Sequence, residues 1–150
     1  MTTPAYPEVQ LFIDGSWTRG TEGQSLKVIN PATGEQIGSF TKADKVDLDR
    51  ALKAAQRGFD VWRKTSAFDR SKLLRRAADI LRERADAIAP LLTLEQGKPL
   101  AEARGELMSS ADVIDWAAEE GRRTYGRIIP ARAAGVQQLA IKEPIGPVAA

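Results

Sequence analysis

Apolar residues recur at spacings of three and four along the middle of the chain, which is the period of an amphipathic helix. Three stretches show it, at residues 44–62, 66–92 and 99–120. Their apolar positions are Leu48, Ala51, Leu52, Ala55, Phe59 and Trp62; Leu74, Ala77, Ala78, Leu81, Ala85, Ile88 and Leu92; and Leu100, Ala103, Leu107, Ala111, Ile114 and Ala118. The pattern predicts three long helices, each with one apolar face.

Polar residues and a proline mark the ends and interruptions of these helices. Either Asp44 or Asp47 is placed to cap the first helix. Ser66 followed by Asp69 resembles a capping box at the start of the second, with Asp in place of the usual Glu. Pro90 is expected to kink the second helix or to mark a restart, because proline removes a helical hydrogen bond.

Short extended segments flank the helices on both sides. Asp14 and Gly15 favour a tight hairpin within residues 11–17, because such turns need positive φ and glycine accepts it. Residues 27–30 and 36–40 are predicted to be two more strands joined by a turn. The order of elements predicts a mainly helical α/β unit.

The end of the chain has the pattern of a hairpin followed by a buried strand. Residues 127–132 and 136–142 alternate in polarity and are separated by Ala-Ala-Gly, a plausible hairpin connection. Residues 148–150 are apolar and look like the first residues of a buried strand. An unpaired hairpin of this kind is expected to project from the helical body and to associate with other strands.

Composition excludes several kinds of chemistry. The 150 residues contain no Cys and no His, which removes a thiol nucleophile, Ser-His triads and most zinc sites. Hydrophobic content of 43% with 28% charge is ordinary for a globular chain, apart from a tail at residues 1–7 that is expected to be disordered. With no apolar run of membrane-spanning length and no signal-peptide pattern, we expect a cytoplasmic protein without a membrane partner.

The charged residues predict no nucleic-acid surface. The net charge is only +2. The basic run between residues 70 and 84 is interleaved with acids, and Arg75–Asp79 and Arg82–Asp86 are spaced to pair along a solvated helix face.

Other candidate residues also favour structural roles. Glu119 and Glu120 are adjacent on a helix and do not converge, Tyr125 is expected to pack, and Trp17, Trp62 and Trp116 are expected to be core or interface residues. From the residues alone we therefore predict no catalytic and no cofactor-binding residue.

A family resemblance runs along nearly the whole chain. It is carried by LFIDGSW, VINPATGEQIGSF, LTLEQGKPLAEARGE, DWAAEEGRRTYGRIIPAR and IKEPIGPVAA, in that order. The chain resembles the NAD(P)-dependent aldehyde dehydrogenases, most of all the succinate-semialdehyde and 2-oxoglutarate-semialdehyde branches. The resemblance implies oxidation of an aldehyde to a carboxylate. It also implies an α/β fold in which a helical layer and short strands of the cofactor-binding domain carry an oligomerisation hairpin.

That resemblance divides the chain and predicts what it lacks. Residues 1–126 would be the N-terminal part of the dinucleotide-binding domain, 127–144 the hairpin that joins a homo-oligomer, and 145–150 the start of the dinucleotide-binding sheet. The family's nucleophilic Cys, general-base Glu and nucleotide contacts come later in its members. We therefore expect a truncated, inactive piece, with NAD or NADP and a small aldehyde bound by the full-length parent.

The resemblance also implies two site assignments within the chain. The carbonyls of Val28 and Ile29 and the carboxylate of Glu95 match the ligands of a structural monovalent cation. Gly105 and Ser109 match positions beside the substrate tunnel, with ordinary helix packing as the alternative. A non-catalytic helical assembly module built on the same scaffold is the alternative function. A reading frame that continues into a TPWNFP-like segment would distinguish the enzyme from that module.

Overall fold

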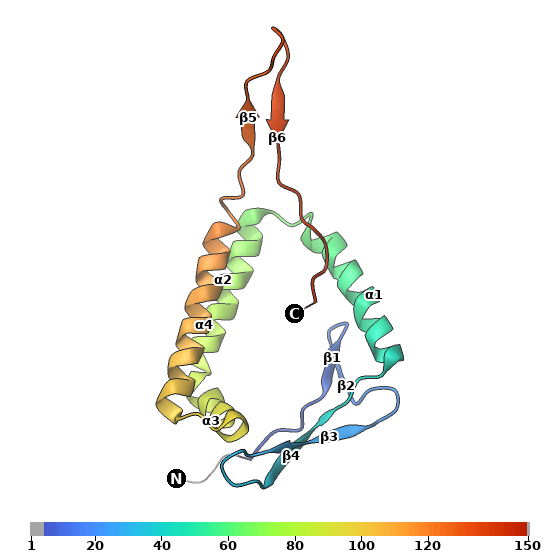
Figure 1. Ribbon diagram of the computed structural model, residues 1–150, viewed down its shortest axis with the longest axis vertical. Coiled ribbons are helices and arrows are strands. Elements are labelled where there is room, and N and C mark those ends of the chain that lie inside the picture. Colours follow the sequence, from blue (N-terminus) through green and yellow to red (C-terminus); the bar gives the residue numbers. More distant parts are fainter. Residues whose placement is uncertain (1–4, 150) are drawn as a thin grey trace.

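The computed structural model describes residues 5–149 as a helical body with three two-stranded sheets (Figure 1). Residues 1–4 of the expected disordered tail and Ala150 of the expected last strand lie outside the described residues. The elements are, in order, β1 (Leu11–Ile13), β2 (Ser16–Thr18), β3 (Ser25–Ile29), β4 (Gln36–Thr41), α1 (Lys45–Trp62), α2 (Ala67–Glu83), α3 (Ala85–Gln96), α4 (Leu100–Glu120), β5 (Arg127–Ile129) and β6 (Gln138–Ala140). The predicted α/β class is confirmed.

Local turn chemistry decides the first two hairpins as predicted. Asp14 and Gly15 both have positive φ, 55° and 77°, and join β1 to β2 in a tight antiparallel pair. The β3–β4 pair is also antiparallel, with Val28 opposite Gly38 and a register shift between Val28 and Ile29. The shift leaves Ile37 of β4 without a partner on β3, which is the pattern of a bulge next to the turn.

The start of α1 is fixed by a buried carboxylate. Asp44 is the N-cap and forms a capping box with Asp47, so both predicted candidates take part. Thr21 donates its N–H and its hydroxyl to Asp47, over 3.1 and 3.0 Å. Burial alone raises the pKa of Asp47, but these hydrogen bonds outweigh it and hold that pKa below its usual value. The loop before β3 is thereby tied to the helix.

The second predicted helix is two helices, and the break is not at Pro90. Helix α2 ends at Glu83 and α3 begins at Ala85, with Arg84 in the bridge region at φ −98° and ψ 1°. Pro90 lies inside α3 without ending it. The turn falls at Arg84 because it lets Ala85 pack against α4, so tertiary packing overrides the local signal.

Small residues form most of the core between α2, α3 and α4. Ala85 and Ala89 from α3 pack with Ala103 and Leu107 from α4 in one buried cluster. Alanine at these positions lets the helices approach closely, and Leu107 fills the space between them. The predicted stripe on α4 is largely confirmed, although Leu100 at its start is exposed.

The hairpin β5–β6 projects from the helical body, as predicted (Figure 1). Arg127 pairs with Ala140 and Ile128 with Leu139. Ile128 is 84% exposed, so the hairpin packs on nothing within the described residues. The regular strands are shorter than the predicted segments, since only three residues of each pair.

Several apolar residues expected in the core or at an interface are exposed. Leu48 and Leu52 on α1 are both more than half exposed, and Trp17 and Trp116 are 69% and 67% exposed. Tyr125 was predicted to pack, and that prediction is wrong, because it is 71% exposed. The leucines and tryptophans lie on faces of α1, α4 and the first hairpin that no described element covers.

Candidate functional site

Gly105 and Ser109 lie together on the exposed face of α4. They are four residues apart, so their side-chain positions stack along one face of the helix. Ala103 and Leu107 point the other way, into the core. A Cβ at Gly105 would meet no heavy atom within 4 Å, so the face is open there. The structure thus leaves this face free for a ligand or another part of a larger fold.

Glu95 lies in the last turn of α3, where the helix meets the β3–β4 turn. Gly97 ends α3 in the left-handed conformation at φ 81° and donates its N–H to the Thr93 carbonyl over 2.8 Å. A Cβ at Gly97 would lie 2.9 Å from Cγ of Pro31. Pro31 follows directly after β3 and Asn30, so the helix end is seated against the turn that Val28 and Ile29 lead into.

Tyr6 joins the same cluster and was missed from the sequence. Its hydroxyl donates to Oε2 of Glu95 over 2.7 Å. Its ring packs on Gly38, where a Cβ would meet Cε1 and Cγ of the ring at 3.2 and 3.3 Å. Gly38 is the strand partner of Val28. Glu95 is thereby connected to β4 through one side chain, and the expected disorder of the tail is wrong for Tyr6, which these contacts hold in place.

The hydroxyl of Tyr6 remains a donor over the whole physiological range. Burial, the hydrogen bond to Glu95 and the negative charge of Glu95 together raise the pKa of Tyr6 to about 12. A protonated phenol beside a carboxylate makes a charge-assisted hydrogen bond, which is stronger than one between neutral groups. The sequence did offer one signal, Gly38, because a glycine inside a strand often marks a place where another segment packs closely on the backbone.

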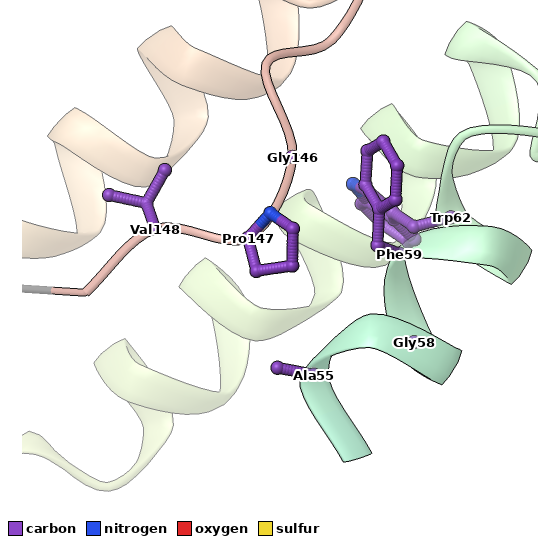
Figure 2. Close-up of a pocket in the computed structure, with 7 residues that line it drawn as sticks. All are labelled: Ala55, Gly58, Phe59, Trp62, Gly146, Pro147 and Val148. Carbon is purple, nitrogen blue, oxygen red and sulfur yellow. The ribbon is translucent and has the colours of Figure 1, made fainter. Parts of the chain in front are cut away.

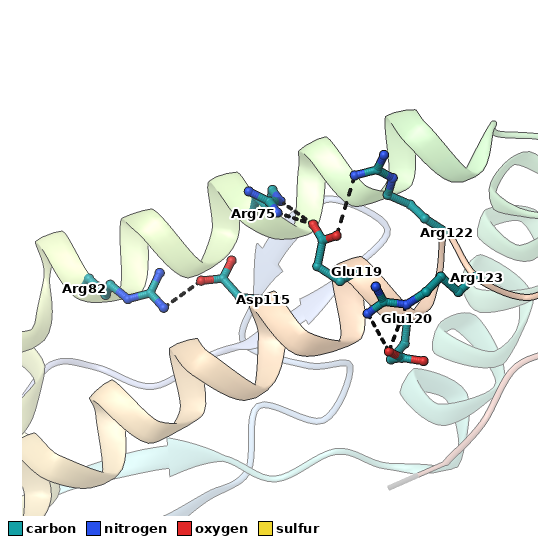
Figure 3. A network of polar contacts seen from close by, with 7 residues as sticks. All are labelled: Arg75, Arg82, Asp115, Glu119, Glu120, Arg122 and Arg123. Carbon is teal, nitrogen blue, oxygen red and sulfur yellow. Dashed lines mark hydrogen bonds and ion pairs between the residues drawn. The ribbon is translucent and has the colours of Figure 1, made fainter.

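Two arginines of α2 form ion pairs across to α4 (Figure 3). Other pairs run along α2 itself, such as Arg76 with Glu83 at 2.9 Å. Arg75 donates to Glu119, and Arg82 donates to Asp115 over 2.6 Å. The predicted pairing of Arg75 with Asp79 and Arg82 with Asp86 is therefore wrong, because the antiparallel packing of the two helices offers closer carboxylates.

Neighbouring carboxylates in this network do not converge on a reacting centre. The hydrogen bond from Arg75 is the main reason that the pKa of Glu119 is lowered. Glu120 instead accepts from Arg123 over 2.6 Å, so the two adjacent carboxylates face different partners (Figure 3). The prediction that these two carboxylates do not converge is confirmed.

A hollow of about 450 Å³ lies between α1 and the end of the chain (Figure 2). It is lined by Ala55, Gly58, Phe59, Trp62, Gly146, Pro147 and Val148. None of these side chains is charged or nucleophilic, so the hollow offers apolar contact and no chemistry of its own. Residues 145–149 form no strand here, and Val148 is exposed.

Within residues 5–149, no three side chains of the His, Cys, Asp and Glu types gather to hold a metal ion. No helix in this range has both the length and the apolar character of a membrane-spanning segment.

Known proteins match this chain along nearly its whole length. A model of the aldehyde dehydrogenase family matches residues 17–150. The chain is 48% identical over 150 residues to 4-(hydroxymethyl)benzenesulfonate dehydrogenase TsaD1 of Comamonas testosteroni. The match covers 100% of this chain and 32% of that relative. It is 43% identical to the NADP(+) succinate-semialdehyde dehydrogenase GabD of Escherichia coli, over 94% of this chain and 29% of that relative.

The fold also matches solved structures. A succinate-semialdehyde dehydrogenase from Burkholderia pseudomallei is similar with a TM-score of 0.90 and 40% identity, over 97% of this chain and 30% of that one. The chain thus spans about 30% of the length of the relatives that it matches. The family resemblance inferred from the motifs is confirmed.

Proposed function

The chain belongs to the aldehyde dehydrogenase family of oxidoreductases, and from that membership we propose that it is the N-terminal part of an NAD(P)-dependent semialdehyde dehydrogenase. The complete enzyme would oxidise an aldehyde such as succinic semialdehyde to the carboxylate. The match over residues 17–150, together with relatives that act on semialdehydes, carries this proposal. A cytoplasmic location, expected from the sequence, is part of it.

In this proposal the chain is a scaffold and the reacting groups lie outside it. A thiolate, a general base and a nicotinamide that accepts hydride carry out the family's chemistry. The 150 residues contain no Cys, so the thiolate must come from elsewhere in a complete polypeptide. We assign residues 1–126 to the dinucleotide-binding domain and 145–150 to the start of its sheet. NAD or NADP would be held by the remainder.

Gly105 and Ser109 would border the substrate tunnel from their exposed face of α4. Small side chains at both positions leave room for a substrate that carries a second charged group, such as a semialdehyde with a terminal carboxylate. The open space at Gly105 supports this assignment. The name of the TsaD1 relative includes a sulfonate, and a tunnel that accepts an anionic end would suit both substrate types.

The cation site would be formed by the carbonyls of Val28 and Ile29 and the carboxylate of Glu95. All three donors are oxygen atoms, which hard cations prefer. The contact of Gly97 with Pro31 and the link from Glu95 through Tyr6 to Gly38 support it, because they join the end of α3 to the turn after β3 and to the strand partner of Val28. In this proposal a monovalent cation fastens the helix end to the strand.

The hairpin at residues 127–144 would join the enzyme into a homo-oligomer. Among residues 5–149 its strands are paired only with each other, so each has a free edge with unpaired backbone groups. Ile128 and Leu139 lie opposite each other, and both are exposed. A strand from another part of the enzyme or from another subunit would satisfy the edge and cover these side chains.

A matched pair of substitutions in the complete polypeptide tests the proposal. With succinic semialdehyde and NAD or NADP, the complete polypeptide should produce reduced nicotinamide, which is measured by its absorbance. Ser109→Leu should raise KM for the semialdehyde by filling the tunnel. Ser110→Leu is the control, since Ser110 is also exposed but points about 100° around the helix. No turnover with any semialdehyde would contradict the function, and equal effects of the two substitutions would contradict the tunnel assignment.

A further inference from the structure

The segment before β1 runs along the edge of β4 as a short extra strand. Val9 forms a parallel bridge with Phe40. The N–H of Thr41 donates to the Val9 carbonyl over 2.9 Å, and the N–H of Val9 reaches the Ser39 carbonyl at 3.4 Å. The backbone at residues 8–10 is therefore fixed to the sheet, and this places Tyr6 over β4.

Tyr6 contacts both the sheet and α3, which are otherwise joined at the Gly97–Pro31 contact. The ring occupies the space that the missing side chain of Gly38 leaves. From there the hydroxyl reaches Oε2 of Glu95, 89 positions along the chain. Glu95 is itself exposed at the end of a helix, so it is this hydrogen bond that restricts its side chain.

We propose that Tyr6 is a positioning residue for the monovalent-cation site: it holds Oε2 of Glu95, so that Oε1 is left to face the ion. This inference rests on the cation site proposed above. An exposed glutamate loses rotamer freedom when it binds an ion, and a hydrogen bond that already fixes the carboxylate reduces that cost. Carboxylate ligands of metal ions are commonly held in this way by a second partner.

A consequence is that cation binding and docking of the N-terminal segment favour each other. If Tyr6 improves the affinity for the ion by some factor, the bound ion stabilises the docked segment by the same factor. A tyrosine that only packs on the sheet would not give this coupling, because its contribution to stability would be the same with and without the ion.

The test uses the complete polypeptide and compares potassium chloride with tetramethylammonium chloride at equal ionic strength. The thermal midpoint should rise with potassium in the unmodified protein, because an ion that binds only the folded state stabilises it. Tyr6→Phe keeps the ring and removes the hydroxyl. It should raise the half-saturating potassium concentration by about tenfold. Tyr125→Phe, at the exposed second tyrosine, should leave that concentration unchanged.

The outcomes separate the positioning role from the cation site itself. If Tyr6→Phe lowers the midpoint equally in both salts and leaves the half-saturating concentration unchanged, Tyr6 is only structural and the inference is overturned. Glu95→Gln should remove the potassium response, whereas Glu102→Gln on α4 should not. If the unmodified protein shows no response to potassium or sodium, the cation site is wrong and the role of Tyr6 falls with it.

Discussion

Replacing Gly97 with alanine should destabilise the chain more than the same change at Gly34. Both glycines have positive φ, 81° and 74°, so alanine is strained at either position. That strain costs about 1–2 kcal/mol. A Cβ at Gly34 meets nothing within 4 Å, whereas a Cβ at Gly97 would lie 2.9 Å from Cγ of Pro31. Gly97→Ala therefore carries a second cost that Gly34→Ala does not.

The second cost can be bounded from the geometry. Cγ belongs to a proline ring, which cannot swing to another rotamer, so either the helix end or the turn must move. Overpacking of this kind costs about 1–3 kcal/mol. We expect a loss of roughly 2–5 kcal/mol for Gly97→Ala and about 1–2 kcal/mol for Gly34→Ala. The larger loss would reflect separation of α3 from the turn beside Ile29.

Urea denaturation followed by circular dichroism measures the difference. With a slope of about 2 kcal/mol per molar urea, the two midpoints should differ by roughly 0.5–1.5 M. The unmodified chain and both variants should have similar slopes, which shows that the same structure unfolds. Equal midpoints for the two variants would refute the close contact between the end of α3 and the Pro31 turn.

Three further predictions follow from the core, the buried carboxylate and the hairpin. Leu107→Ala should cost about 2–5 kcal/mol in chemical denaturation by leaving a cavity, whereas Leu100→Ala, at an exposed position, should cost much less. The pKa of Asp47 is lowered in the folded state, so its stabilisation is present above the unfolded pKa and is lost as pH falls below roughly 4. Asp47→Asn should therefore reduce the loss of the free energy of unfolding at low pH, measured by denaturation at a series of pH values, and Asp49→Asn should not. Ile128→Arg should shift the complete polypeptide toward smaller assemblies in sedimentation, and an unchanged distribution would exclude the hairpin from the interface.

Features set by neighbouring residues could be predicted from the sequence. The Asp14–Gly15 turn follows from backbone geometry alone, and the capping box of Asp44 and Asp47 from residues three apart. The helix break at Arg84 could not be predicted, because it is set by the packing of Ala85 against α4. Local periodicity runs through that break without interruption.

Contacts between distant segments were the main source of error. Arg75 and Arg82 of α2 pair across to α4 because the two helices lie side by side, which no spacing rule along α2 shows. Tyr6 lies in a tail with the composition of a disordered segment, yet its partner Glu95 is 89 positions away. Gly38 was the one local signal of that approach. The assignments of Val28, Ile29, Gly105 and Ser109 came from family resemblance and stay predictions.

The central claim is that these 150 residues are a scaffold whose reacting groups lie outside them. It is tested most directly by assaying the purified 150-residue chain beside the complete polypeptide, with succinic semialdehyde and NAD or NADP, in preparations free of host dehydrogenases. We predict that the complete polypeptide produces reduced nicotinamide and that the 150-residue chain gives no more than the buffer blank. Turnover by the 150-residue chain alone would contradict the claim.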